Sequence, residues 1–154
     1  AAEYDLVTIA DLSGLDISIA SDPEFFGRSE WTRTRDAYGL QSLQTRSMDS
    51  AFMYDAVKGG EVGLITAYTT DARIDAFDLV LLEDTRAILP PYDAFLLLSP
   101  QAGENEALLN ALEPLQGAID TGLMRRANGK VDMERQSVNE AGAWLHGQVF
   151  QPAE

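Results

Sequence analysis

The sequence of 154 residues has no cysteine and only one histidine, and its charge is strongly one-sided. Without cysteine the chain cannot form a disulfide, a thiolate nucleophile or a cysteine-based metal site. Eleven Lys and Arg stand against twenty-five Asp and Glu, so the formal net charge is −14. Because a protein that binds nucleic acid presents a basic face to the phosphates, this balance argues against a nucleic-acid partner.

Long apolar runs are also missing. No run reaches the roughly 18 residues of a membrane span, and the longest, near residues 79–82 and 94–98, have the length of strands. Residues 1–12 lack the basic start and the apolar stretch of a signal peptide. If the protein is exported, we therefore expect its leader to have been removed or to lie outside this sequence.

The order of the predicted elements is that of an α/β protein. Strands alternate with helices in the first half, and helices crowd the end of the chain. Asp22 and Pro23 suit the start of a helix that Tyr38-Gly39 would end, and Gly59-Gly60 would stop a helix over 48–58. Strands are predicted at 14–21, 43–47, 61–68, 78–84 and 93–99, and later helices at 105–116, 120–128 and 137–150, with Asp120 and Ser137 as caps of the last two.

Residues suited to catalysis are few. His146 stands alone near the end of the last predicted helix, where an exposed or half-buried position is expected and a zinc site is not. Glu83-Asp84 could bind a hard cation, but a solvated strand end is favoured. The sequence has neither a Gly-x-Ser-x-Gly motif nor a phosphate-binding glycine loop. We predict no enzyme, no cofactor and no metal; paired carboxylates are the weakest alternative.

Glu24 and Arg28 stand four residues apart on one face of the helix that follows the first predicted strand. An ordinary surface ion pair explains this spacing. The position suggests more, since ligands of α/β proteins gather at the carboxyl ends of strands. An arginine oriented there by a glutamate could bind the carboxylate of a ligand.

Two tyrosines occupy unusual positions: Tyr68 at the end of a predicted strand and Tyr92 directly after Pro90-Pro91. Each could be a packing residue. Rings on stiff backbone can also enclose a quaternary ammonium group, because aromatic faces attract cations. Together with Arg28 they would suit a small zwitterion.

Segments along nearly the whole chain form a further pattern: TIADL (8–12), DPEFFGR (22–28), YGL (38–40), MDSAFMYDAV (48–57), AYTTDARIDAFDLVLLED (67–84), LPPYDAF (89–95), LMRRANGKVD (123–132) and the helix with Trp144-Leu145. In these segments the chain resembles the substrate-binding proteins of ABC importers for glycine betaine, choline and related quaternary ammonium compounds. The resemblance implies a two-lobed α/β fold of the periplasmic-binding-protein type II, a solute-binding role and a location that is periplasmic or extracytoplasmic and membrane-associated. The partners it implies are a quaternary ammonium osmolyte and an ABC permease.

By position, Tyr68 and Tyr92 match tyrosines of the family's aromatic cage, and Arg28, oriented by Glu24, matches the arginine that binds the ligand carboxylate. The resemblance implies that residues 1–68 belong to the second lobe and 75–154 to the C-terminal part of the first, with a hinge at about 68–74. Ala72 departs from the family, which has glycine there, so a turn with positive φ would be strained.

Length is the larger departure, because everything before TIADL in the family is missing. Half of the cage is then absent, so weak ligand binding or none is expected from this chain alone. The chain would be a fragment, or it would pair with another copy: strands near 79–83 and 95–98 would lack neighbours, and open apolar edges invite pairing. A homodimer is therefore possible. The alternative function is a stand-alone interaction or dimerisation domain that keeps the scaffold without ligand binding.

Overall fold

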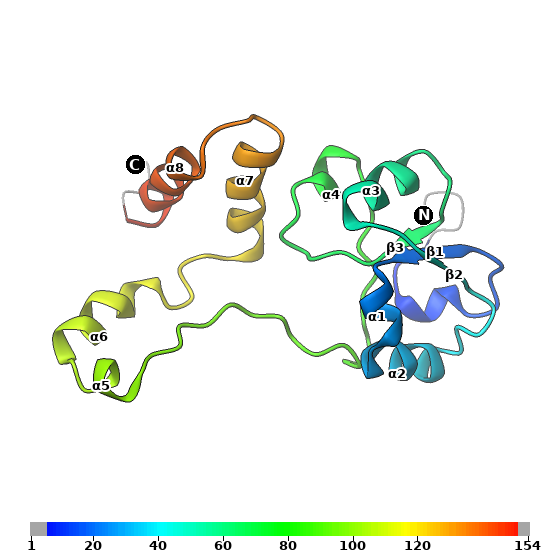
Figure 1. Ribbon diagram of the computed structural model, residues 1–154, viewed down its shortest axis with the longest axis horizontal. Coiled ribbons are helices and arrows are strands. Elements are labelled where there is room, and N and C mark those ends of the chain that lie inside the picture. Colours follow the sequence, from blue (N-terminus) through cyan, green and yellow to red (C-terminus); the bar gives the residue numbers. More distant parts are fainter. Residues whose placement is uncertain (1–5, 151–154) are drawn as a thin grey trace. The chain divides into compact units, whose positions relative to one another are not determined.

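The computed structural model in Figure 1 describes residues 6–150, and these form two compact units. The sheet unit comprises residues 6–68 and 73–91, and the helical unit comprises residues 69–72 and 92–150. Residues 1–5 and 151–154, the ends of the expected lobe segments 1–68 and 75–154, lie outside the described residues.

The sheet unit is built on three parallel strands, as the α/β pattern predicted. They are β1 (Ser18–Ser21), β2 (Gln44–Ser47) and β3 (Leu64–Ile65), in the order β2-β1-β3 (Figure 1). Ile19 pairs with Thr45 on one side and with Leu64 on the other. The strands predicted at 14–21, 43–47 and 61–68 are confirmed, although each is shorter than its apolar segment.

Neighbouring residues of β1 enter two different cores, because successive side chains of a strand point to opposite faces of the sheet. Ile19 packs in one cluster with Leu12 and Trp31. Ala20, which is fully buried, packs in the other with residues of α3 (Ser50–Lys58) and the loop after it: Met53, Ala56 and Val62. The central strand therefore carries a core on each face, as the sheet of an α/β layer structure should.

One helix predicted after β1 is in fact two. They are α1 (Pro23–Gly27) and α2 (Ser29–Tyr38), separated at Arg28, where the backbone is extended (φ −81°, ψ 154°). The predicted cap is confirmed, because the Asp22 carboxylate accepts a hydrogen bond of 2.8 Å from the Phe25 amide. Gly39 ends α2 in the left-handed region (φ 68°), which glycine adopts without strain.

The helix predicted over 48–58 is confirmed as α3, which begins after Asp49. The Asp49 carboxylate accepts a hydrogen bond from the Ala51 amide, and this cap moves the start two residues beyond the expected one. The remaining helices of the sheet unit are short: η1 (Ile9–Leu12), a 3-10 helix, and α4 (Arg73–Ala76).

The strand predicted at 78–84 is wrong. This segment forms only an isolated parallel bridge, between Thr8 and Glu83, with hydrogen bonds of 3.0 and 2.9 Å to the backbone of Ile9 and Val7. Leu82 of this segment, and Ile88 and Leu89 just after it, pack against the core that contains Ile9 and Leu12, so burial against side chains replaces strand pairing.

The helical unit contains α5 (Pro100–Gly103), α6 (Glu106–Leu112), a 3-10 turn η2 (Glu113–Leu115), α7 (Thr121–Asp132) and α8 (Val138–Phe150). The helices predicted at 105–116, 120–128 and 137–150 are confirmed. Asp120 caps α7 through the Leu123 amide at 2.6 Å. Ser137 and Glu140 cap α8 reciprocally, each side chain accepting from the other's amide.

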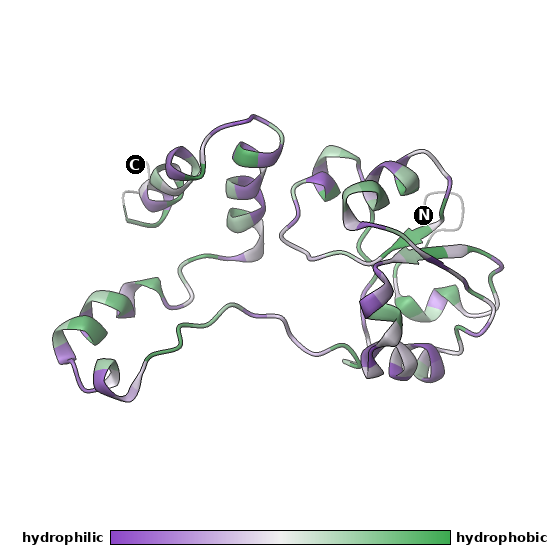
Figure 2. Cartoon of the chain, viewed as in Figure 1, coloured by the Kyte–Doolittle hydropathy of each residue, from purple (hydrophilic) through white to green (hydrophobic). Residues whose placement is uncertain are grey.

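The strand predicted at 93–99 is also wrong in the described structure. The segment is extended, but none of the hydrogen bonds of the described residues involves the backbone of 93–98. Phe95 and Leu97 are 81% and 86% exposed, whereas Leu96 and Leu98 line a hollow against α6. Figure 2 shows the apolar character of the chain that leads into α5. A strand needs a partner for its main chain, and the described residues supply none.

None of the helices in residues 6–150 has both the length and the apolar character that a bilayer span requires. Residues 73–91, which include the start of the segment expected in the first lobe, pack with the sheet unit. How the two units correspond to the lobes of a complete receptor, and the hinge at 68–74, stay predictions.

Candidate ligand-binding site

The three parallel strands end at one edge of the sheet, and the predicted site residues of the sheet unit follow these ends. Asp22 and α1 come directly after β1, and Tyr68 comes three residues after β3. The buried Ser21 hydroxyl and the Thr66 hydroxyl, 2.5 Å apart, join the ends of these two neighbouring strands. In open α/β sheets this edge is the usual place for a ligand.

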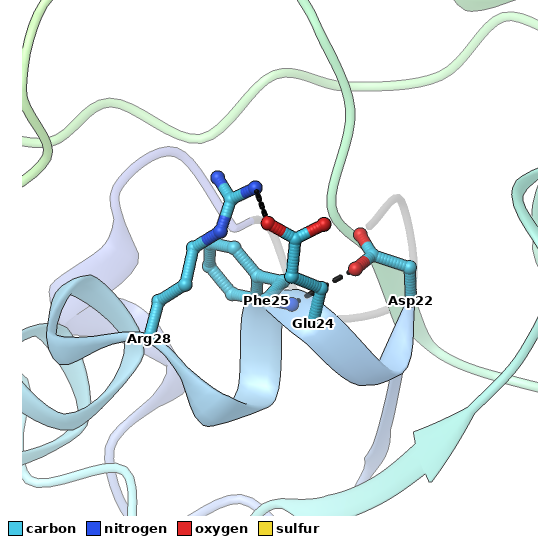
Figure 3. A network of polar contacts seen from close by, with 4 residues as sticks. All are labelled: Asp22, Glu24, Phe25 and Arg28. Atoms are coloured by element: carbon cyan, nitrogen blue, oxygen red, sulfur yellow. Dashed lines mark hydrogen bonds and ion pairs between the residues drawn. The ribbon is translucent and has the colours of Figure 1, made fainter.

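The predicted ion pair between Glu24 and Arg28 is present. An oxygen of the Glu24 carboxylate accepts a hydrogen bond of 2.6 Å from the Arg28 guanidinium, and Figure 3 shows the two side chains pointing toward each other. The Arg28 side chain is 36% exposed and that of Glu24 is 76% exposed. Such a pair adds little stability, but it fixes the direction of the guanidinium.

Aromatic packing holds α1 in place beneath this pair. Phe26 and Trp31 meet edge to face, with ring centroids 5.3 Å apart, and Phe25 lies 6.1 and 6.2 Å from their rings. Trp31 is buried in the core of the sheet unit. Arg28 therefore directly follows a short helix that is anchored by the Asp22 cap and by these rings.

Tyr68 and Tyr92 are 66% and 58% exposed, so neither ring is a core residue of the described chain. Tyr68 ends the first stretch of the sheet unit, three residues after β3. Tyr92 begins the long stretch of the helical unit, directly after Pro91. The convergence of the two phenol rings with Arg28 stays a prediction.

The segment after Tyr68 belongs to the helical unit and is tied to α7. The Arg125 guanidinium donates to the Thr69 carbonyl through Nε at 2.8 Å and Nη2 at 2.6 Å. The Asn128 amide donates to the Thr70 carbonyl at 2.9 Å. Neither residue was expected to have a role, although both lie in the segment LMRRANGKVD, because nothing local marks a side chain that binds a distant carbonyl.

Ala72 causes no strain. The residues other than glycine with positive φ in the described chain are Asp78, Ala87 and Arg135, so the backbone at Ala72 is in an ordinary region. Its side chain is 7% exposed and faces Gly129 of α7. The loop therefore accommodates alanine where the family has glycine, and the expected strain is absent.

Asp84, one of the two residues weighed as a cation ligand, is used for structure instead. Both carboxylate oxygens accept hydrogen bonds, from the Tyr38 hydroxyl and from the amides of Leu89 (2.7 Å) and Arg86 (3.3 Å). Partial burial raises the pKa of this carboxyl, but the hydrogen bond from Tyr38 and those from backbone amides outweigh burial and hold the pKa below its ordinary value.

No group of three or more His, Asp or Glu that could hold a metal ion occurs in residues 6–150. His146 is exposed on α8, as expected, with its ring centroid 4.8 Å from that of Phe150. The arrangement offers a guanidinium, hydroxyls and exposed phenols, which suit reversible binding of a small polar molecule.

Comparison with known proteins shows which family the chain resembles. The family of substrate-binding domains of ABC-type glycine betaine transport systems (OpuAC) matches residues 1–146. The chain is 31% identical over 128 residues to a glycine-betaine-binding protein of Pseudomonas aeruginosa, covering 80% of this chain and 41% of that protein. It is 26% identical over 137 residues to the carnitine transport binding protein OpuCC of Listeria monocytogenes, covering 86% and 44% respectively.

A third relative is the ergothioneine transport permease/ergothioneine binding protein EgtU of Helicobacter pylori, 24% identical over 141 residues, with 89% of this chain and 26% of that protein covered. Among solved structures, a glycine betaine/carnitine/choline ABC transporter protein shares the fold, with a TM-score of 0.79 and 23% identity over 96% of this chain and 56% of that one. The expected α/β periplasmic-binding-protein fold is thus confirmed. The chain spans less than half the length of these curated relatives, and it belongs to the family of substrate-binding domains of ABC-type glycine betaine transport systems.

Proposed function

We propose that this chain is part of the solute-binding component of an ABC importer and contributes to a site for glycine betaine, choline or a related quaternary ammonium osmolyte. Arg28 binds the ligand carboxylate, Glu24 orients Arg28, and Tyr68 and Tyr92 form walls of the cage around the trimethylammonium group. The observation that carries the proposal is the Glu24–Arg28 pair, held on an anchored helix at the carboxyl edge of the parallel sheet.

The chemistry of these residues accounts for a zwitterionic ligand. Each tyrosine face in contact with the methylated ammonium contributes about 0.5–2 kcal/mol, more when water is excluded. A hydrogen bond from Arg28 to the carboxylate adds about 1.5–3 kcal/mol, because both partners are charged. Ordering the ligand and the loops offsets much of this sum. The carboxylate also distinguishes glycine betaine from choline as a ligand, because choline lacks a carboxylate and gains no binding energy from Arg28.

The family places such domains outside the cytoplasmic membrane, so we propose a periplasmic or extracytoplasmic, membrane-associated location and an ABC permease as partner. Closure of the lobes around the ligand, with a hinge at residues 68–74, would signal loading to the permease. The role is binding and delivery, with no catalytic step.

Titration of the 154-residue chain tests the proposal. Nuclear magnetic resonance of labelled tyrosine rings and of the arginine Nε–H groups should show saturable shifts at Tyr68, Tyr92 and Arg28 on addition of glycine betaine. We expect a Kd of about 1 mM or weaker, which corresponds to about 4 kcal/mol, because only part of the cage is present. Choline should shift the tyrosine signals and leave the Arg28 signal unchanged.

Two results would count against the proposal. Saturable shifts confined to tyrosines other than Tyr68 and Tyr92 would remove these two rings from the site. Calorimetry that gave a micromolar Kd for the chain alone would contradict the expected weakness and show that the site is already complete.

The second candidate function is self-association without ligand binding, and the exposed extended segment 93–98 favours it. Phe95 and Leu97 are largely exposed, and the main chain there is open to another strand. In this view a second copy pairs along 93–98 to form a homodimer. Light scattering at increasing protein concentration decides: a dimer that Leu97→Lys converts to monomer supports this candidate, and a monomeric parent chain removes it.

A further inference from the structure

The chain enters the helical unit for four residues between two stretches of the sheet unit. Tyr68 precedes this segment, Thr69–Ala72 form it, and Arg73 returns to the sheet unit as the first residue of α4. We call Thr69–Ala72 the strap. The chain passes from one unit to the other at both ends of the strap, so the backbone dihedral angles there would change in any hinge motion.

Three positions on one face of α7 hold the strap. Arg125, Asn128 and Gly129 have the spacing i, i+3 and i+4, which places them side by side on a helix. Arg125 holds the Thr69 carbonyl with two donors, and Asn128 holds that of Thr70 with one. Gly129 faces Ala72, since a Cβ atom at Gly129 would lie 3.4 Å from the Ala72 Cβ, which is an ordinary van der Waals contact.

We infer that Arg125 and Asn128 are positioning residues, which fix the strap to α7 and thereby the direction in which Tyr68 leaves the strap. The bond to Arg125 is the strong one, because a charged donor meets a single carbonyl through a fork of two N–H groups. The link to ligand binding rests on the proposed function; the mechanical link does not.

The neighbouring arginine provides a matched control. Arg126 lies one residue along α7, is exposed, and takes no part in the hydrogen bonds to Thr69 and Thr70. Removing it changes the charge of α7 as much as removing Arg125 does. An effect specific to Arg125→Gln and Asn128→Ala therefore reports the strap and not the charge or the helix propensity of α7.

Backbone relaxation of the 154-residue chain, without ligand, tests the inference. We expect amide order parameters of about 0.85 for residues 69–72 in the parent, falling below about 0.7 in Arg125→Gln and in Asn128→Ala. The ring signals of Tyr68 should shift in both variants and stay in place in Arg126→Gln. Arg125→Lys, which keeps the charge and loses the fork, should recover part of the order.

Circular dichroism and thermal unfolding identify any variant that fails to fold. If either Arg125→Gln or Asn128→Ala fails to fold, the other variant tests the inference. If a folded Arg125→Gln or Asn128→Ala keeps the order of the strap and the Tyr68 signals, the inference is overturned, whatever the ligand does. If the strap order and the Tyr68 signals change in both variants while glycine betaine shifts only tyrosines other than Tyr68 and Tyr92 in the parent chain, the positioning role stands and the proposed ligand site falls. The two failures are therefore distinguishable.

Discussion

The Tyr38 hydroxyl donates a hydrogen bond to the Asp84 carboxylate, which lies 46 residues further along the chain. The same hydroxyl accepts a hydrogen bond of 2.8 Å from the Arg86 amide, and the Arg86 guanidinium lies over the Tyr38 ring. These contacts fasten the segment after α4 to α2, the helix that begins next to Arg28. The support of the proposed ligand site thus depends partly on a buried phenol far from it in sequence.

Replacing Tyr38 by phenylalanine should destabilise the chain while leaving its fold intact. The ring remains to fill the core, but Asp84 loses its hydroxyl donor and the Arg86 amide loses its acceptor. We expect the free energy of unfolding at pH 7 to fall by about 1.5–3 kcal/mol, the usual range for a hydrogen bond to a charged group. Urea unfolding of the two proteins measures the difference.

The same pair predicts a dependence on pH. The pKa of Asp84 is lower in the folded chain than in the unfolded chain, where it is about 3.9. The carboxylate therefore contributes stability that is fully present above about pH 4 and is lost as the pH falls through the lowered folded value. The difference between the parent and Tyr38→Phe should shrink below about pH 4. A difference that stayed constant or grew on acidification would rule out this linkage.

Variants of Asp22 and Glu24 distinguish a carboxylate that stabilises α1 from one that orients Arg28. Asp22→Ala removes the cap of α1 and should lower the free energy of unfolding by about 1 kcal/mol. Glu24→Gln breaks only an exposed i, i+4 pair, which is worth about 0.3–0.5 kcal/mol. Equal and large losses in the two variants would show that Glu24 serves the fold and would weaken its proposed role in orienting Arg28.

Arg28→Lys tests the carboxylate contact. A lysine keeps the charge but lacks the planar fork, so it matches a carboxylate poorly. The Kd for glycine betaine, measured from the ring shifts of Tyr68 and Tyr92, should rise about tenfold, which corresponds to about 1.4 kcal/mol of binding free energy. The Kd for choline should stay unchanged. Tyr68→Ala or Tyr92→Ala should weaken both ligands. A variant at Arg28 that affected choline as much as glycine betaine would exclude a contact with the carboxylate.

Leu97 and Leu98 are adjacent and should behave differently. Leu97 is 86% exposed, so Leu97→Ala should change the free energy of unfolding by less than about 0.5 kcal/mol. Leu98 lines the hollow against α6, and Leu98→Ala should cost about 1 kcal/mol or more, part of the roughly 2–5 kcal/mol of a fully buried leucine. Similar losses at both positions would show that the segment packs in solution on both of its faces.

Features that depend on a few neighbouring residues were predictable from the sequence. The caps at Asp22, Asp120 and Gly39 lie where side-chain chemistry and glycine conformation place them. The ion pair of Glu24 with Arg28 follows from helical spacing, although the helix ends there. The break at Arg28 itself was missed, because the rings of α1 and Trp31 pack in a way that no local pattern indicates.

Features that depend on distant partners were not predictable. The runs at 78–84 and 93–99 are apolar enough for strands, but a strand exists only where another backbone pairs with it. One run packs through side chains instead, and the other has no ladder in the described chain. The links from Arg125 and Asn128 to the strap, and from Tyr38 to Asp84, join residues about fifty positions apart, beyond the reach of periodicity or spacing.

The strap also decides what a protease would release. The Pro91–Tyr92 bond directly precedes the segment 93–98, whose main chain makes no hydrogen bond in the described structure, and a single cut there would leave fragments 1–91 and 92–154. The first fragment still carries residues 69–72, whose carbonyls Arg125 and Asn128 of the second fragment grip. The nicked protein should therefore elute from a size-exclusion column as one species. The two fragments, held together by noncovalent contacts alone, should separate only in denaturant.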